Sequence, residues 1–259
     1  MLAFFRTIIS EPLYNILVFL TVIIPTNQVG WAIIILTLLV RSLLFPFQHN
    51  ASKTQAKVKE LDPEIKRIKE ECKDDKQQQA QKTMELYKEH GINPFTGIIM
   101  ILIQLPIILS LFFLFYQGFS LDTSILYDFT PYPDDVNLKF LGFININESN
   151  IFLAVLVGIT QFIQMKLAMP VIDNKKALGQ GSFKEDFGKS LSLQMKYVMP
   201  IMIAFIASSL PAAVSLYWLT SNTFTVGHEV LVKKQAYKLG ILKKNKTETE
   251  EQKEIKETD

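Results

Sequence analysis

Long apolar stretches separated by charged segments run through most of the chain. They predict membrane-spanning helices, because a helix needs about 20 predominantly apolar residues to cross the hydrocarbon core of a bilayer. Five such stretches occupy residues 30–47, 94–116, 151–169, 195–210 and 212–232. The fourth is short and meets the fifth at a tight turn around Pro211, which implies a locally thinned bilayer or a shielded position.

A further apolar segment precedes these five stretches. It covers residues 13–24, which is too short to span a bilayer, and it follows Glu11 and Pro12. No small-residue cleavage site of a signal peptide follows near Thr26. We predict that residues 1–29 form a helix lying in the extracytoplasmic membrane interface, with a tilted spanning helix as the alternative.

The charged segment between the first two spans has a helical pattern of its own. Apolar residues recur there at spacings of three and four, the seam of a coiled coil. They are Val58, Leu61, Ile65, Ile68 and Cys72, then Ala80, Met84, Tyr87 and Gly91. With a polar turn at residues 74–76 between them, the two runs predict an antiparallel helical hairpin over residues 49–93. A solvated charged linker, the alternative, would not keep this spacing.

Charge distribution sets the predicted orientation. Lysine and arginine are concentrated in the hairpin, in residues 171–194 and in the tail, residues 233–259. The segment 117–150 instead has one cation, Lys139, among several acidic residues. The positive-inside rule therefore places the first three segments in the cytoplasm and the last one outside. The fold class is an all-α polytopic membrane protein with five transmembrane helices.

Arg41 interrupts the first predicted span and is its most unusual residue. A charge in hydrocarbon costs roughly 2.5–3.5 kcal/mol on insertion scales, so water or polar partners usually reach it. Snorkelling past Phe47 is the alternative, since that end of the span lies about 9 Å away. Helical side chains tilt toward the helix N-terminus, however, which points Arg41 deeper into the membrane. We therefore favour a polar cavity around Arg41.

Polar residues in this span and in the others support such a cavity. Thr37 lies four residues before Arg41 and so shares its helix face. Each further polar residue alone is explained by hydrogen bonding between helices, but together they favour one hydrophilic cavity. They are Gln104, Thr160, Gln161, Gln164, Lys166, Ser208, Ser209, Ser215, Trp218 and Asn222.

The sequence offers no catalytic or ligand-binding pattern. The three histidines stand apart without metal-ligand spacing, and no Ser/His or Cys/His pair can be assembled within the spans. The single cysteine, Cys72, excludes a disulfide framework, and no glycine-rich phosphate loop is present. We therefore expect no enzymatic activity, no cofactor, no metal and no specific nucleic-acid site.

Several longer motifs occur in an order that resembles the YidC family of membrane protein insertases, which has relatives in mitochondria and chloroplasts. The motifs are EPLYN, GWAIIILTLLVR, FPFQHNASKTQAKVKELDPEIKRIKEE, ELYKEHGINPFTGIIMILIQLPIILSLF and SLPAAVSLYWLTSNTFTVGHE. The resemblance covers about residues 10–240. It is to a short bacterial form, without the large extracytoplasmic domain of some Gram-negative members.

The resemblance implies a five-helix core, residues 30–232, around a hydrophilic groove that opens to the cytoplasm and to lipid. Arg41 matches the groove arginine of the family. The other residues that the resemblance assigns to the groove are Thr37, Gln104, Gln161, Gln164, Ser215, Trp218 and Asn222, and it does not separate Gln161 from Gln164.

The implied function is insertion of proteins into the bacterial cytoplasmic membrane. Newly made membrane proteins and the lipid bilayer are the expected partners, and the ribosome, the targeting machinery and the Sec translocon are candidates. The alternative is a small-solute transporter, which would be expected to show inverted repeats or glycine-interrupted helix pairs that this sequence lacks.

Overall fold

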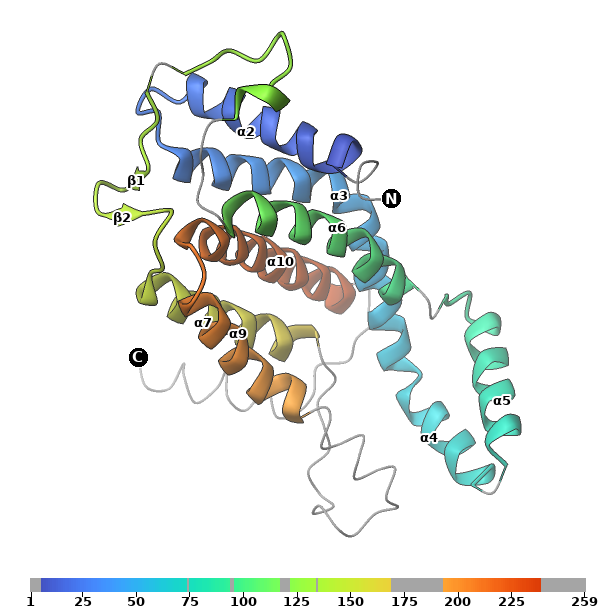
Figure 1. Ribbon diagram of the computed structural model, residues 1–259. Helices are drawn as coiled ribbons and strands as arrows, with labels where there is room; N and C mark the ends of the chain where they lie inside the picture. Colours follow the sequence, from blue (N-terminus) through green and yellow to red (C-terminus); the bar gives the residue numbers. More distant parts are fainter. Residues whose placement is uncertain are drawn as a thin grey trace. The chain divides into compact units, whose positions relative to one another are not determined.

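Helices make up most of the chain in the computed structural model, as predicted (Figure 1). The structure describes residues 6–73, 75–93, 96–116, 122–133, 135–168 and 193–238. The chain forms two compact units. Unit 1 comprises Met1–Phe45 and Ile101–Gly227, and unit 2 comprises Pro46–Met100 and His228–Asp259.

Six of the described helices contribute to unit 1. They are α2 (Glu11–Ile23), α3 (Val29–Glu60), α6 (Thr96–Tyr116), α7 (Ile151–Ala168), α9 (Met199–Ser208) and α10 (Ala212–Lys238). Short π-helical turns precede α2 at Arg6–Ser10 (η1) and α9 at Gln194–Val198 (η3). Helices α3, α6 and α10 each contribute residues to both units.

Helix α3 is longer than the sequence pattern indicates. The apolar stretch ends at residue 47, but the helix continues through Pro46 to Glu60. A proline inside a helix has no N–H to donate to the carbonyl four residues earlier, and this weakens the helix without necessarily ending it. Unit 2 begins at Pro46, so the boundary between the units falls at this weak point.

Among the residues that the structure describes, two helices are long and apolar enough to cross a membrane, judged by length and composition: Arg6–Ile23 and Val29–Thr54. The first of them begins at Arg6 because η1 precedes α2, so it is longer than the apolar segment 13–24. The interfacial helix and the tilted spanning helix both stay predictions for this segment. Three shorter apolar helices are also present, at Leu105–Tyr116, Ile151–Leu167 and Gln194–Ser208. The number of five spans remains a prediction.

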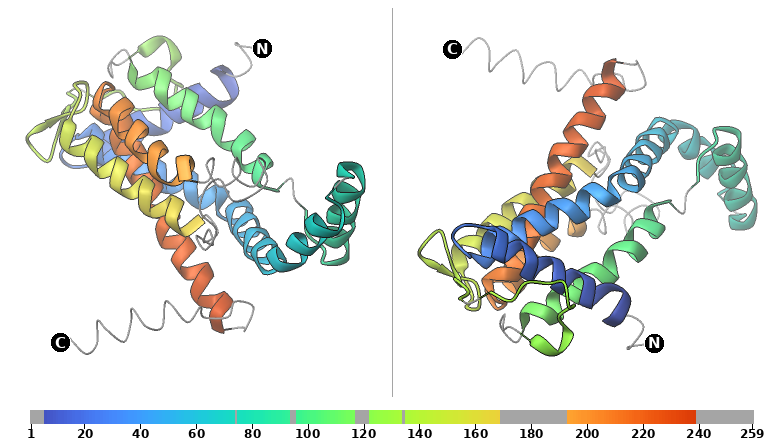
Figure 2. Two further views of the ribbon diagram at one scale, coloured as in Figure 1. Left: turned by 90° about the horizontal axis from the view of Figure 1, so that it is seen from below. Right: turned by 90° about the horizontal axis from the view of Figure 1, so that it is seen from above.

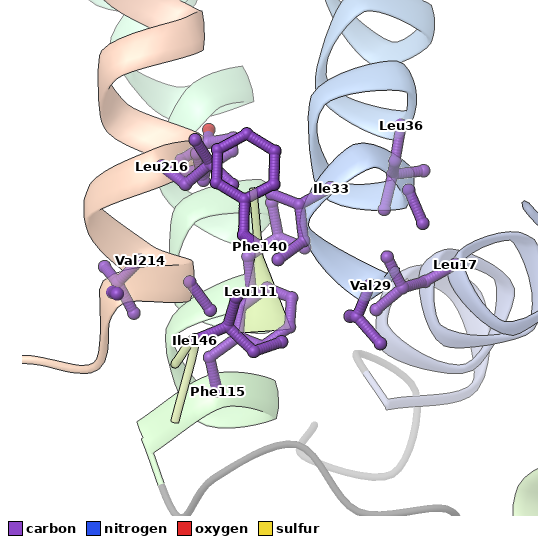
Figure 3. Packing of buried hydrophobic residues seen from close by; sticks show 14 of the residues in the cluster. Leu17, Val29, Ile33, Leu36, Leu111, Phe115, Phe140, Ile146, Val214 and Leu216 are labelled. Carbon is purple, nitrogen blue, oxygen red and sulfur yellow. The ribbon is translucent and has the colours of Figure 1, made fainter. Parts of the chain in front are cut away.

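The apolar core of unit 1 joins segments that are far apart in the sequence. Side chains of α2, α3, α6 and α10 point toward one another around Phe140 and Ile146, which come from the segment before α7 (Figure 3). The buried members drawn and labelled there are Leu17, Val29, Ile33, Leu36, Leu111, Phe115, Phe140, Ile146, Val214 and Leu216. This packing holds the helices that carry the predicted groove residues.

The segment between α6 and α7 supplies hydrogen-bond acceptors to the start of two helices. The Val29 amide, in the first turn of α3, donates to the Asn137 carbonyl at 3.1 Å. The amides of Ala212 and Ala213, which open α10, donate to the carbonyls of Glu148 and Ile146 at 2.7 and 2.9 Å. These amides have no acceptor within their own helices, so the segment completes both helix ends.

A small β-hairpin lies within the same segment (Figure 1). Strands β1 (Lys139–Phe140) and β2 (Ile144–Asn145) are antiparallel, and Phe140 is opposite Ile144. Both of these side chains are buried in the core of unit 1. Phe140 reaches α3 because residue 30 is glycine: a Cβ there would lie 2.4 Å from Phe140 Cδ2.

Asn15 fixes a second part of this connection. Its side-chain amide donates to the Glu11 and Ile125 carbonyls, both at 2.9 Å, and its Oδ1 accepts from the Tyr127 amide at 2.7 Å and the Thr130 hydroxyl at 2.8 Å. A buried polar side chain whose hydrogen bonds are all satisfied stabilises the fold and also specifies one arrangement of the segments that it joins. Asn15 thereby holds residues 125–130 against α2.

Helices α7 and α9 lie side by side, as the left-hand view of Figure 2 shows. A Cβ added at Gly158 of α7 would lie 2.8 Å from the Ala204 Cβ of α9. Small residues at the contact let the two backbones approach closely, which is the usual basis of helix packing in membranes.

In unit 2, helices α4 (Asp62–Glu71) and α5 (Lys76–Glu89) pack against each other around four buried side chains, those of Leu61, Ile65, Leu86 and Ile92. The first run of the predicted seam takes part in this packing, with Val58 and Ile68 at its edge. The second run is wrong in part: Tyr87 packs at the edge of the cluster as predicted, but Ala80, Met84 and Gly91 are exposed and Leu86 is buried.

The departure at Gly91 has its cause at the end of α5. Gly91 has a positive φ of 61°, the Gly91 amide donates to the Lys88 carbonyl and the Ile92 amide donates to the Tyr87 carbonyl. This is a Schellman cap, which turns the chain back and folds the following apolar residue onto the helix. Ile92 thus enters the cluster from outside the helical repeat.

We expect Gly91→Ala to loosen the end of α5. An alanine at this φ costs about 1–2 kcal/mol relative to glycine, although a Cβ would meet no neighbour there. Amide hydrogen exchange between Leu86 and Ile92 should therefore become faster. Gly91→Asn is the control, since asparagine tolerates this conformation better; equal exchange rates in the alanine variant and the wild type would contradict the assignment.

Gly30→Ala should destabilise unit 1 as a whole. The new methyl group would overlap the Phe140 ring, and overpacking of this kind typically costs about 1–3 kcal/mol. The midpoint of thermal unfolding in detergent should fall. Gly227→Ala is the matched control, because its Cβ would meet nothing within 4 Å in a helix; if both variants unfold at the wild-type temperature, Phe140 is not seated as described.

Candidate functional site

Arg41 of α3 is bound to Ser221 of α10, and both residues belong to unit 1. Its Nε donates to the Ser221 hydroxyl at 2.9 Å, and a second guanidinium nitrogen, Nη2, donates to the same oxygen. The guanidinium has five N–H groups, so this hydroxyl engages only part of its capacity. In the described part of the chain no carboxylate forms an ion pair with Arg41.

A second polar contact lies beside the first on α10. The Asn222 side-chain amide donates to Gln161 Oε1 at 3.0 Å and, at 3.4 Å, to the hydroxyl of Thr160, both on α7. Asn222 is only 4% exposed. Because Ser221 and Asn222 are adjacent, one turn of α10 holds Arg41 of α3 on one side and the Gln161 amide of α7 on another.

Two of the predicted groove residues have their hydroxyls engaged with backbone. Thr37 is buried on the face of Arg41 and donates to the Ile33 carbonyl of its own helix at 2.6 Å. Ser215 is fully buried and donates to the Ala207 carbonyl at 3.3 Å, which ties α10 to α9. In this conformation both hydroxyls bond to backbone carbonyl oxygens of the helices.

The remaining predicted groove residues lie in different surroundings. Gln164 of α7 has a buried Oε1 that accepts no hydrogen bond from the described residues. Trp218 is half-buried and packs against the main core and against the smaller cluster of Ala154, Val157 and Ala207. Gln104 lies in α6, and its side chain falls outside the described residues.

Sequence reasoning missed Ser221, the direct partner of Arg41. The prediction followed the stripe of Ser215, Trp218 and Asn222 along α10. A second stripe runs through Ser221, Thr225 and His228 at spacings of four and three, and all three residues are buried. Two polar stripes on a mostly apolar helix were the available signal.

Two of the three histidines lie together, contrary to the expectation from sequence. In unit 2, His49 Nδ1 of α3 lies 3.2 Å from His228 Nε2 of α10, and the Ser52 hydroxyl donates to Glu229 Oε1 at 2.6 Å. The two histidines are 179 positions apart, so spacing could not reveal the pair. Among the described residues, no group of three or more His, Cys, Asp or Glu side chains is placed to hold a metal ion.

The chain matches known proteins over most of its length. The family model of the 60Kd inner membrane protein matches residues 19–239. A Clostridium tetani protein named membrane protein insertase YidC is 34% identical over 212 residues, which cover 81% of this chain and 84% of the relative. A Francisella tularensis protein of the same name is 30% identical over 203 residues, or 78% of this chain and 32% of that longer relative.

A solved structure supports the fold. It is described as an active YidC insertase with the first transmembrane domain resolved, and it aligns with a TM-score of 0.54 at 24% identity. The alignment covers 84% of this chain and 45% of the solved chain. With the family model matching residues 19–239, the chain belongs to the 60Kd inner membrane protein family, whose relatives named here are YidC membrane protein insertases.

Proposed function

We propose that this chain is a membrane protein insertase. It would receive the hydrophilic segment of a newly made protein in a polar groove within the membrane and release the apolar segment into the lipid bilayer. Family membership supports this function, and the contact of Arg41 with Ser221 is the observation that carries the mechanism.

Arg41 keeps several N–H donors available for a substrate. Its helix is apolar on both sides of the residue, and a charge in such surroundings needs polar partners. Ser221 accepts from Nε and Nη2, which leaves three of the five guanidinium N–H groups for water or for a passing segment. A carboxylate fits this role best, because guanidinium and carboxylate form charge-assisted bidentate bonds. Acidic segments should therefore benefit most.

The amides beside Arg41 extend the same principle to uncharged segments. Asn222 and Gln161 bond to each other at 3.0 Å, and each amide carries both donors and acceptors. They can exchange this bond for bonds to a peptide group at little cost. A peptide group without a partner in hydrocarbon costs several kcal/mol, so such an exchange lowers the barrier to crossing.

The proposal includes five spanning helices in a core of residues 30–232 and an orientation set by charge. The hairpin, residues 49–93, and the tail, residues 233–259, would lie in the cytoplasm, and residues 1–29 outside. The membrane would be the bacterial cytoplasmic membrane. The hairpin would be the contact for ribosomes, the targeting machinery or the Sec translocon, since it is the largest charged element on that side.

Replacing Arg41 should impair acidic substrates selectively. Vesicles holding only this protein would be given a single-span substrate whose outer segment is acidic, and a matched substrate whose outer segment is neutral. We expect Arg41→Ala to slow insertion of the acidic substrate by about tenfold or more, from the loss of bonds worth about 1.5–3 kcal/mol. Arg41→Lys should restore much of the rate, because it keeps the charge.

The control is Arg67→Ala, which removes an exposed arginine of α4. It should leave both substrates unaffected. Equal insertion of both substrates by wild type and Arg41→Ala would refute the role of the charge. Failure of the wild type to insert either substrate would refute autonomous insertion by this chain.

Ser221→Ala should produce a weaker form of the same defect. The hydroxyl holds the guanidinium, so its loss leaves the charge in place but no longer oriented. We expect the acidic substrate to slow more than the neutral one, and less than in Arg41→Ala, while Ser221→Thr keeps the hydroxyl and the rate. A uniform loss with both substrates would instead assign Ser221 to helix packing.

A further inference from the structure

The tip of the β1–β2 hairpin exposes apolar side chains. Phe140 and Ile144 point into the core, whereas Leu141 is 52% exposed and Phe143 is 73% exposed. The Phe143 amide donates to the Phe140 carbonyl at 3.3 Å, which closes a tight turn around Leu141 and Gly142. Polar residues normally occupy such a tip, so this one calls for a partner.

Leu141 stands in a conformation that leucine disfavours. Its φ is 52°, and that of Gly142 is 84°. Turns with two positive φ values favour asparagine followed by glycine, and a non-glycine residue in this region costs about 1–2 kcal/mol. A leucine at such a position, with half of its side chain exposed, points to a use outside the fold itself.

The tip is fixed to the start of α3. The Leu141 amide donates to Gln28 Oε1 at 3.3 Å, and the Trp31 ring packs edge-on against Phe140, with the ring centroids 5.3 Å apart. Together with the bond between Val29 and Asn137, these contacts give the tip a defined height along α3.

That height corresponds to the apolar surface of the helices. Leu141 and Phe143 line a groove of about 500 Å³ together with Ile34 and Leu38 of α3 and Phe152 of α7. Ile34 and Leu38 lie about 8 and 14 Å along α3 from Val29, at about 1.5 Å per residue. The tip side chains therefore lie beside the apolar surface of the first turns of α3. The groove is lined almost entirely by apolar residues, with side chains of α10 also contributing.

We propose that this hairpin tip is a lipid-binding element: Leu141 and Phe143 insert into the bilayer interface, and the groove behind them holds a phospholipid acyl chain. The exposed apolar surface continues onto Ile151 and Phe152, which open α7, and Trp31 marks the interface as tryptophan commonly does. At the base of the hairpin, the exposed Lys139 faces the polar Asn145 across the strands, as suits contact with lipid phosphate.

Figures 1 and 2 show the hairpin within unit 1 beside the start of α7, as the lining of the groove requires. The hairpin would set the depth at which α3 and α7 enter the membrane. This inference is independent of insertase activity, because it needs a bilayer and no substrate.

The test uses the single cysteine of the chain. Cys72 is replaced by alanine, and Phe143→Cys carries an environment-sensitive fluorophore. The protein is reconstituted alone in phosphatidylcholine and phosphatidylglycerol vesicles with iodide on both sides. The matched control is the same label at Glu148→Cys, an exposed polar position of the same segment.

We expect the label at 143 to emit at shorter wavelength, to be quenched by nitroxide-bearing lipids and to be protected from iodide severalfold relative to the label at 148. A second label at Leu141→Cys should behave as the one at 143, and it guards against a variant that fails to fold. Labels at 141 and 143 that iodide quenches as strongly as the label at 148 would overturn the proposal. Such a result would indicate that the tip faces water or awaits a protein partner.

Discussion

Backbone amides at the start of α3 and α10 must find acceptors, and the segment between α6 and α7 provides them. In a membrane protein water cannot always do this, so the requirement constrains the path of the segment. The carbonyls of Asn137, Ile146 and Glu148 meet it. Their positions seat Phe140 on Gly30 and fix the starts of both helices within one unit.

The position of the Arg41 contact follows from this constraint. Arg41 lies about 18 Å along α3 from Val29, and Ser221 lies about 14 Å along α10 from Ala212, at about 1.5 Å per residue. Arg41 thus lies farther from the start of its helix than Ser221 does. Its long side chain can bridge this difference, because helical side chains lean toward the N-terminus of their helix. The guanidinium therefore reaches the Ser221 hydroxyl, which lies nearer to the capped start of α10.

Apolar stretches indicated most of the helices and their order, because burial in lipid or core requires a run of apolar residues. They could not show that α3 continues to Glu60, since a charged helix outside the apolar region has no such requirement. The Schellman cap at Gly91 brings Ile92 into a cluster that helical spacing does not include. Arg41, Gln161 and Asn222 could be singled out because polar residues are rare in spans. Ser221 and the pair of His49 with His228 depend on which helices are neighbours, and the sequence of one chain does not show that.

The polar contacts of unit 1 determine how the charge of the Arg41 site depends on acidity. A guanidinium keeps its proton in proteins, and the amides of Gln161 and Asn222 and the hydroxyl of Ser221 do not titrate in the physiological range. The site therefore carries one fixed positive charge whatever the acidity on either side of the membrane. In the proposed groove, a change in the proton gradient would therefore act on the carboxylates of the passing segment and leave the charge of Arg41 unchanged.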